Sequence, residues 1–185
     1  MKRHYYSRAL PIEELVKLYN EDYWRGQTSD FEGGILSHNV ERERYYSSVA
    51  DKVVARKAKS VLEVGCGLGQ VVAILRQRGI KAEGVDVSPW AVENAVTPIV
   101  LGNALALPFA DKEFDLVFSH DFLEHIPLVA LGRVSGELER VGERNYHIIS
   151  CGSLPNDRDI THVTMHRISW WRRRALPSFE MEMKD

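Results

Sequence analysis

The feature that most constrains the fold is a short apolar run that leads at once into a glycine-rich turn, VLEVGCGLGQ at residues 61–70. Residues 60–64, SVLEV, have the composition of a buried strand, and the glycines that follow can adopt positive φ at no steric cost. The next stretch, QVVAILRQRG at 70–79, places apolar residues on one helical face and ends at a glycine. A strand that passes through glycines into a helix predicts the start of a β–α–β unit.

The same alternation continues along the chain. Further strands are predicted at 81–87, 98–104, 114–120, 145–150 and 178–183, and further helices at 11–20, 38–58, 88–95, 127–140 and 169–176. Residues 21–34 hold three glycines and are predicted to form a loop. This order predicts an α/β protein with a doubly wound, mostly parallel sheet and helices on both faces. We expect one domain over 1–185, with an N-terminal helical cap or lid at 1–58 and the sheet-containing core at 59–185.

Composition excludes several classes of protein. The 185 residues carry a formal net charge of −2, so a general nucleic-acid binder, which is usually strongly basic, is not expected. No apolar run approaches the ~20 residues of a membrane span, and the N-terminus lacks the apolar core of a secretory signal. The two cysteines, Cys66 and Cys151, make neither a disulfide framework nor a CxxC metal pair. We expect reduced thiols in a cytoplasmic protein that is a monomer or a homodimer.

The first two loops predict a ligand site. In a parallel sheet, ligands bind beyond the carboxyl ends of the strands, and GCGLG at 65–69 lies at such an end and opens a helix. Exposed N–H groups at a helix start favour a carboxylate or phosphate. Asp86 ends the second predicted strand, where an acid can accept hydrogen bonds from two ribose hydroxyls. Together these features predict a nucleoside that carries a small anionic group.

The glycine spacing is G-x-G-x-G and not the G-x-G-x-x-G of dinucleotide-binding proteins, which disfavours a nicotinamide oxidoreductase. VLEVGCGLG resembles the first motif of the class I S-adenosylmethionine-dependent methyltransferases, and GVDVS at 84–88 is similar to their second. GNALALPFADKEFDLVFSHDFLEHI at 102–126 and GELERV at 136–141 extend the resemblance over about residues 55–150. It is greatest with the small-molecule methyltransferases of the type 11-like group, and it implies a Rossmann-like fold.

The resemblance implies a cofactor, S-adenosylmethionine, which leaves as S-adenosylhomocysteine, and a set of residues that bind it. The glycine loop would flank its methionine part and ribose, Glu63 would orient that loop or the cofactor ammonium, and Asp86 would hold the ribose hydroxyls. The adenine would lie beside Val87, and Ser119 and His120 would line the methionine side. The complete predicted set is Glu63, Gly65, Cys66, Gly67, Gly69, Asp86, Val87, Asn103, Ala104, Leu105, Ser119 and His120.

Three departures from the family pattern stand out. Asn103 occupies a position that is more often aspartate, although an amide can both donate to and accept from adenine. The turn before the strand at 145–150 reads GERN where relatives often have Pro-Gly-Gly. The family sheet usually continues to a hairpin of sixth and seventh strands, whereas this sequence ends at Asp185, so either the sheet or the chain is truncated.

The catalytic residue is the least constrained element, because methyl transfer to a good nucleophile requires alignment and only sometimes a base. Histidine is the natural base near neutral pH, and the candidates are His125, His120, His162 and His166, of which the first three are selected as catalytic residues. His162 and His166 are four residues apart, but with no glutamate beside the first histidine and no evident third ligand, no metal site is predicted. We expect their segment to be a loop over the mouth of the site.

Two further features have more than one interpretation. Tyr23 and Trp24, predicted to lie in a loop beside Arg25, fit either ordinary packing or a lid in which Arg25 faces the cofactor carboxylate. The run of arginines at 172–174 fits a solvated helix face better than an anion-binding patch.

The leading functional hypothesis is methyl transfer from S-adenosylmethionine to an oxygen, nitrogen or carbon of a small molecule. The alternatives are methylation of RNA or protein, and a partner subunit that retains the methyltransferase fold without catalysis. The fold alone does not identify the acceptor.

Overall fold

The computed structural model describes residues 12–25, 40–150, 161–174 and 179–183. Predictions about residues 1–11, 26–39, 151–160, 175–178 and 184–185, including those on Cys151, lie outside the described residues. None of the helices in the described part of the chain has the length and apolar composition that a membrane span requires.

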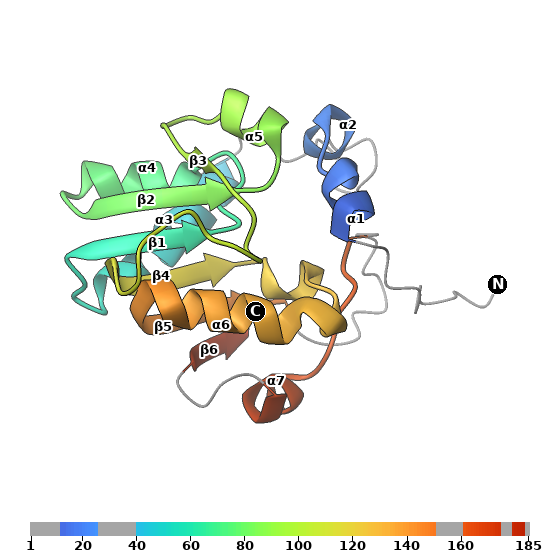
Figure 1. The fold of residues 1–185 in the computed structure, drawn as a ribbon. Coiled ribbons are helices and arrows are strands. Elements are labelled where there is room, and N and C mark those ends of the chain that lie inside the picture. Colours follow the sequence, from blue (N-terminus) through green and yellow to red (C-terminus); the bar gives the residue numbers. More distant parts are fainter. Residues whose placement is uncertain (1–11, 26–39, 151–160, 175–178, 184–185) are drawn as a thin grey trace.

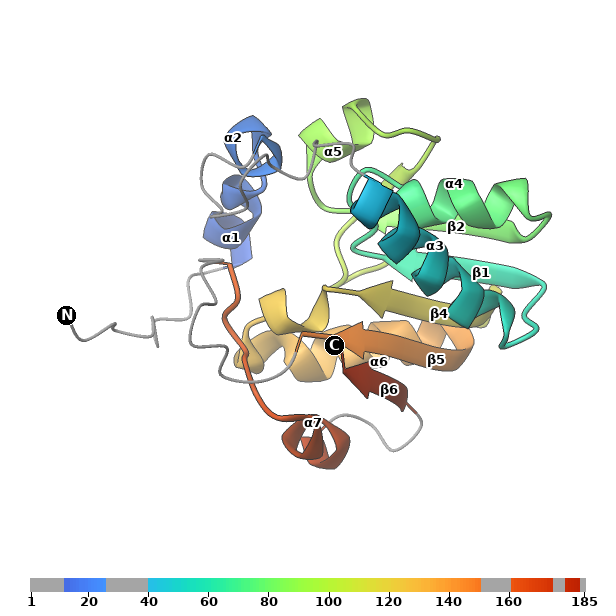
Figure 2. The same ribbon diagram turned by 180° about the vertical axis from the view of Figure 1, so that it is seen from behind.

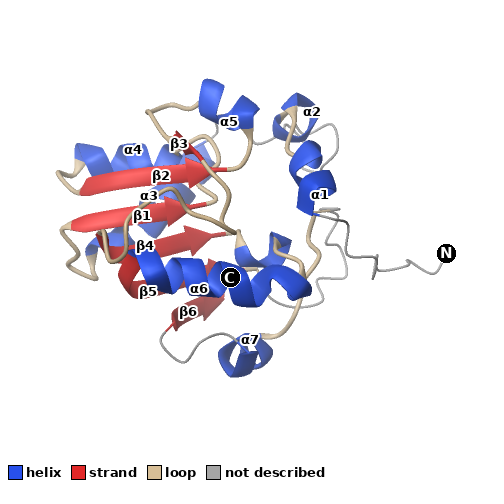
Figure 3. Ribbon diagram, in the orientation of Figure 1, coloured by secondary structure: helices blue, strands red, loops and turns tan. Residues whose placement is uncertain are grey.

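The described strands form one parallel sheet (Figures 1 and 3). The strands are β1 (Ser60–Val64), β2 (Lys81–Asp86), β3 (Val100–Leu101), β4 (Phe114–His120), β5 (Gly142–Ile149) and β6 (Phe179–Met183), in the order β3-β2-β1-β4-β5-β6. The first strand, β1, therefore lies inside the sheet. β2 and β3 follow on one side of it and β4, β5 and β6 on the other, so the strand order reverses between β1 and β4. This arrangement confirms the predicted doubly wound α/β fold. Such a reversal opens a crevice at the carboxyl ends of the central strands.

Helices cover both faces of the sheet and its carboxyl edge. They are α1 (Ile12–Leu18), α2 (Glu21–Trp24), α3 (Val40–Val54), α4 (Gln70–Gln77), α5 (Pro89–Glu93), the 3₁₀ turn η1 (Leu123–His125), α6 (Leu128–Val141) and α7 (Ile168–Arg174). Helices α3 and α4 lie on one face and α6 on the other, while α1 and α2 lie beyond the ends of the strand arrows (Figures 1 and 2).

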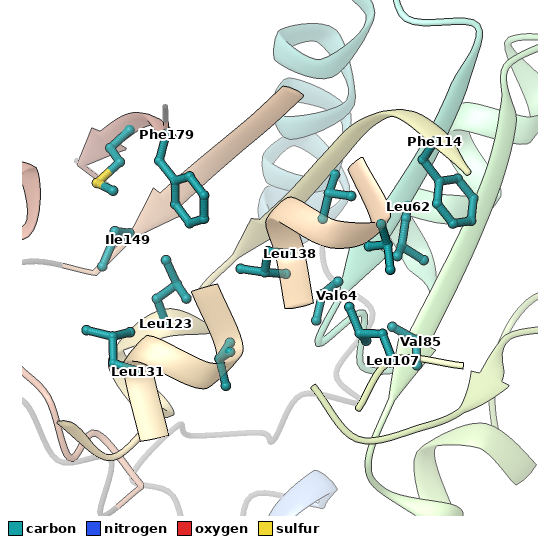
Figure 4. Close-up of a cluster of buried hydrophobic side chains, with 14 of the residues drawn as sticks. Leu62, Val64, Val85, Leu107, Phe114, Leu123, Leu131, Leu138, Ile149 and Phe179 are labelled. Atoms are coloured by element: carbon teal, nitrogen blue, oxygen red, sulfur yellow. The ribbon is translucent and has the colours of Figure 1, made fainter. Parts of the chain in front are cut away.

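The sheet separates two apolar clusters. One cluster joins α6, α7 and the sheet, and contains the fully buried side chains of Leu62 and Leu138 (Figure 4). Trp171 of α7, which is also fully buried, belongs to the same cluster. The other joins α3 and α4 to the opposite face, through Ala50 and Leu75 among others. Full burial of one such side chain stabilises the folded state by about 1.5–3 kcal/mol. The two clusters therefore hold the strands, and with them the strand ends, in place.

Several predicted element ends are shifted by a few residues, as in α3, which ends at Val54 and not at residue 58. Three further differences are larger or have a structural cause. Residues 21–24 form a helical turn where a loop is predicted, because the Asn20 side chain accepts a hydrogen bond from the N–H of Tyr23 and caps it. β3 covers 100–101 and not 98–104, and residues 103–106 form a turn closed by a hydrogen bond from the N–H of Ala106 to the carbonyl of Asn103. β5 starts at Gly142, because α6 passes into it with no intervening turn.

Candidate functional site

A cavity of about 140 Å³ lies at the carboxyl ends of the central strands. The predicted residues that line it are Gly65, Asp86, Val87, Asn103, Ala104, Leu105 and His125. Its other walls come from α1, α2, η1 and the start of α6 and are mainly apolar, among them Val16, Tyr19, Phe122 and Ile126. An apolar cavity with a few convergent polar groups is the usual form of a small-ligand site.

The glycine loop that follows β1 is contacted by the chain's own aromatic side chains. Gly65 has φ +70°, and a Cβ placed there would lie 2.4 Å from Cδ2 of Phe122. Gly67 has φ +55°, and a Cβ there would approach the Trp24 ring to 3.1 Å. Both positions therefore require glycine for conformation and for close packing, before any ligand is considered.

Asp86 is held by the loops on either side of it. Its Oδ2 accepts a hydrogen bond from the N–H of Gly67 at 2.8 Å, and its Oδ1 accepts one from the N–H of Ser88 at 2.9 Å. Burial raises the pKa of this carboxyl to about 6, against the opposing effect of those N–H groups. The glycine turn and the carboxylate thus form one rigid unit at the wall of the cavity.

The segment after β3 forms a compact turn along another wall. The Asn103 Oδ1 accepts a hydrogen bond from the N–H of Leu105 at 2.9 Å, which closes an Asx turn. One lone pair of the amide oxygen is therefore used locally, and the second lone pair and the amide N–H groups remain for a ligand.

The other predicted cofactor residues do not line the cavity. The fully buried Glu63 places Oε1 2.8 Å from Nδ1 of His120, and burial raises the pKa of Glu63 while the histidine opposes that rise. The Ser119 hydroxyl is hydrogen-bonded to Nδ1 of His147 at 2.8 Å, and burial lowers the pKa of His147 to about 3. These four side chains thus contact one another in pairs on β1, β4 and β5.

Two residues of the glycine loop also pack away from the cavity. Cys66 is a buried free thiol whose pKa is raised by burial, and it contacts the sheet face beneath α4. Gly69 is the N-cap of α4, beside Thr97 and Ile99.

Helices α1 and α2 are anchored over the site by a small hydrogen-bonded cluster. The indole N–H of Trp24 donates to Ser88 Oγ at 3.2 Å and to the carbonyl of Tyr19 at 3.3 Å, and the Ser88 hydroxyl donates to the same carbonyl at 2.6 Å. The Trp24 ring also stacks on Trp90 of α5. Since Ser88 follows Asp86 by two residues, this cluster ties the cap to the end of β2.

Arg25 does not face the cavity. Its Nε lies 2.6 Å from Glu21 Oε1, and both side chains are about half exposed. The arginine thus makes a surface ion pair, a contact that contributes little to stability. Arg172 and Arg173 are likewise exposed on α7.

The candidate histidines fall into two groups. His125 lines the cavity, bonds through Nδ1 to Thr161 Oγ1 at 2.8 Å, and stands 4.7 Å from His162 between ring centroids. His120 belongs instead with Glu63. His166 stacks on Trp170 with ring centroids 3.8 Å apart, and residues 162–167 are not helical, so His162 and His166 do not share a helical face.

Three residues that were not predicted from the sequence lie at the cavity or beside it. Asp121 and Phe122 line the cavity immediately after β4, and Asp121 adopts φ +49°, which is uncommon for a non-glycine residue. Glu124 is fully buried on η1. Only their position in the sequence could have indicated them: DFLE at 121–124 directly follows a predicted buried strand, at the edge of the sheet where ligands bind.

Comparison with known proteins identifies the class. The sequence profile of the family described as "Methyltransferase domain" matches residues 62–149, which span β1 to β5. The sequence of residues 62–149 therefore matches a methyltransferase domain, and the resemblance to class I S-adenosylmethionine-dependent methyltransferases inferred from the sequence motifs is confirmed.

Individual relatives agree with this class. Tocopherol O-methyltransferase of Arabidopsis thaliana is 30% identical over 158 residues, which cover 79% of this chain and 42% of the relative. Norajmaline N-methyltransferase of Rauvolfia serpentina is 33% identical over 84 residues, 39% of this chain and 29% of that one. The chain spans about half the length, or less, of the curated relatives it matches first.

A solved structure shares the fold. The magnesium protoporphyrin IX methyltransferase of Synechocystis PCC 6803, solved with bound S-adenosylmethionine, aligns with a TM-score of 0.63. The alignment covers 90% of this chain and 85% of that chain at 21% sequence identity. At this identity the likeness concerns the fold alone.

The residues present fit S-adenosylmethionine. Asp86 lines the cavity as a carboxylate, and its oxygens offer about four lone-pair sites, of which Gly67 and Ser88 occupy two. The remaining sites suit the two hydroxyls of a ribose. The apolar walls and the amide of Asn103 suit an adenine ring.

Proposed function

We propose that this protein transfers a methyl group from S-adenosylmethionine to an oxygen, nitrogen or carbon of a small molecule. The observation that carries the proposal is the position of Asp86, rigidly oriented by the glycine loop at the wall of an apolar cavity, within a methyltransferase domain. The relatives named above are called O- and N-methyltransferases of tocopherol and norajmaline, which supports a small-molecule acceptor.

Specific residues take separate roles in this proposal. Asp86 holds the ribose, while Val87, Asn103 and the two residues after it surround the adenine. The bound cofactor supplies an electrophilic methyl group on a sulfonium. The protein aligns the acceptor with that group and excludes water, which the apolar walls and the α1–α2 cap achieve. Glu63 and His120 contact each other at the carboxyl ends of β1 and β4.

Proton removal, where the acceptor requires it, is assigned to His125. Of the histidines predicted as bases, His125 lines the cavity, whereas His120 contacts Glu63.

We propose a single domain in which α1 and α2 form the cap, since α3 packs with α4 against the sheet. We place the protein in the cytoplasm, as a monomer or homodimer, because the buried free thiol of Cys66 is compatible with a reducing compartment.

Calorimetric titration with S-adenosylhomocysteine tests the proposal. We expect one equivalent to bind, with a rise in melting temperature, and we expect NADH to produce neither effect. Absence of heat and of a thermal shift would reject the enzymatic proposal and favour a partner subunit. Tight, salt-sensitive retention of tRNA in a mobility-shift assay would favour RNA as the acceptor.

The pH dependence of cofactor binding gives a second test. Because the pKa of Asp86 is raised to about 6, the carboxyl takes up a proton as pH falls through 6 and loses acceptor sites for ribose. We expect the affinity for S-adenosylhomocysteine to fall about tenfold between pH 7 and pH 5. An Asp86→Asn variant should show a weaker affinity that changes little over this range, and an identical pH profile in both proteins would contradict the ribose role.

A further inference from the structure

A cluster of one glutamate and two histidines lies beside the cavity, and the cofactor proposal does not account for it. The side chains of Glu124, His125 and His162 each place one potential ligand atom within 4.8 Å of the others. Donor atoms in a tetrahedral site with metal bonds of 2.0–2.2 Å are about 3.5 Å apart. Small side-chain rotations would therefore bring the three atoms to the separation that a metal ion requires.

Backbone contacts explain how residues far apart in the sequence come together. The N–H groups of Val163 and Thr164 donate to the carbonyl of Glu124 at 3.0 and 2.9 Å, and the Thr164 hydroxyl donates to the carbonyl of Ile126 at 2.6 Å. The segment that carries His162 is thereby fixed along η1. The arrangement is thus a built feature of the fold and not a chance approach of flexible side chains.

The environment of the Glu124 carboxyl group favours a bound cation. Glu124 is fully buried, and its Oε1 accepts a hydrogen bond from the N–H of Ser150 at 3.0 Å. Its Oε2 is buried and has no hydrogen-bond partner among the described residues. A buried carboxyl oxygen without a partner is costly whether or not the group is protonated, because its acceptor or its O–H donor is then unsatisfied. A cation at this position removes the cost.

The neighbouring histidine is oriented as metal ligands usually are. His125 is hydrogen-bonded through Nδ1 to Thr161 Oγ1 at 2.8 Å, and a partner of this kind on one ring nitrogen fixes the orientation of a metal-binding imidazole. His125 also lines the cavity, so a cation held by it would border that cavity.

We propose that Glu124, His125 and His162 bind a divalent transition-metal ion, with Zn²⁺ as the best match. Two imidazoles and one carboxylate are donors that Zn²⁺ accepts readily, whereas Mg²⁺ prefers oxygen ligands throughout. At this place the ion completes its coordination with an oxygen of the acceptor molecule. With the ion bound, His125 is a ligand, which replaces the role of proton acceptor proposed for it above. Methyl acceptors with a hydroxyl or carboxylate oxygen are then favoured.

Titration of chelator-treated, tag-free protein with ZnCl₂ tests the site. We expect one equivalent of Zn²⁺ to bind, MgCl₂ to give no comparable heat, and Co²⁺ to develop a visible d–d absorption on binding. In Glu124→Gln and His162→Ala, Zn²⁺ affinity should fall by about a hundredfold or more, since loss of a mere outer partner of a ligand already costs 10–100-fold.

His166→Ala is the matched control, because His166 lies four residues along the same segment and stacks on Trp170. Its Zn²⁺ affinity should equal that of the unmodified protein. Absence of Zn²⁺ binding, or equal loss in His166→Ala and His162→Ala, would overturn the proposal. Circular dichroism melts identify variants that fail to fold, and Glu124→Gln retains the size of the side chain.

The same samples distinguish failure of this proposal from failure of the proposed function. Titration with S-adenosylhomocysteine should give the same affinity in Glu124→Gln as in the unmodified protein. Binding of that compound without any Zn²⁺ binding would reject the metal site alone, and Zn²⁺ binding without it would reject the cofactor proposal alone.

Discussion

Replacing Asp86 by alanine is expected to reduce the affinity for S-adenosylhomocysteine by about a hundredfold or more. The substitution removes two charge-assisted hydrogen bonds to the ribose, each worth about 1.5–3 kcal/mol. It also leaves the N–H groups of Gly67 and Ser88 without their acceptor, so the loop geometry loosens. Calorimetric titration at pH 7.5 measures the effect directly.

A surface aspartate provides the control for that substitution. Asp51 lies on α3, is largely exposed, and pairs with Arg78 at 2.7 Å. Asp51→Ala removes a carboxylate of the same type far from the cavity and should leave the affinity unchanged. Asp86→Asn should lower the affinity by an intermediate amount. The amide keeps one acceptor oxygen, but its NH₂ group faces the N–H of Gly67 or Ser88, which is also a donor. Equal affinities in Asp86→Ala and the unmodified protein would contradict the ribose assignment.

The order of strands and helices could be predicted because each local signal agreed with the global fold. β1 and β4 have the predicted bounds, since continuous apolar runs in a parallel sheet end at clear polar or glycine positions. β5 begins earlier than predicted. Gly142 pairs with Phe114 while α6 has only just ended, and no local pattern marks a strand that starts without a turn.

The candidate site was predictable where it depends on neighbours in sequence and much less where it depends on tertiary contacts. Asp86 and Asn103 end or follow strands of the first β–α–β units, so their place at the ligand edge follows from topology. The pairing of Glu124 with His162 does not, because it is produced by hydrogen bonds between η1 and a loop that follows β5. Spacing rules for metal motifs compare residues on one element and therefore miss such a cluster.

The glycine loop shows how a correct motif can have more than one physical cause. From the sequence, the glycines are predicted to allow close approach of a ligand to the backbone. In the structure, Phe122 and Trp24 already occupy the space beside Gly65 and Gly67. Intramolecular packing and cofactor binding thus place the same requirement on these positions, and a substitution there affects stability as well as binding.

Gly65→Ala is accordingly expected to destabilise the fold by about 3 kcal/mol. The left-handed conformation costs an L-residue about 1–2 kcal/mol, and forcing a methyl group against Phe122 adds about 1–3 kcal/mol. Urea denaturation measures the free energy of unfolding. Gly79→Ala is the matched control, because Gly79 has a similar φ of +80°, and in the described part of the chain no atom beyond its chain neighbours lies within 4 Å of the added Cβ.

The difference between these two variants isolates the contact with Phe122. Gly79→Ala should cost about 1 kcal/mol, close to the conformational penalty alone. In a protein that already carries Phe122→Ala, adding Gly65→Ala should cost only the conformational penalty, because the clash needs both side chains. The double-mutant cycle measures this coupling free energy. If Gly65→Ala and Gly79→Ala cost the same, Phe122 does not pack against the loop. The first glycine of the motif would then be required by backbone conformation alone.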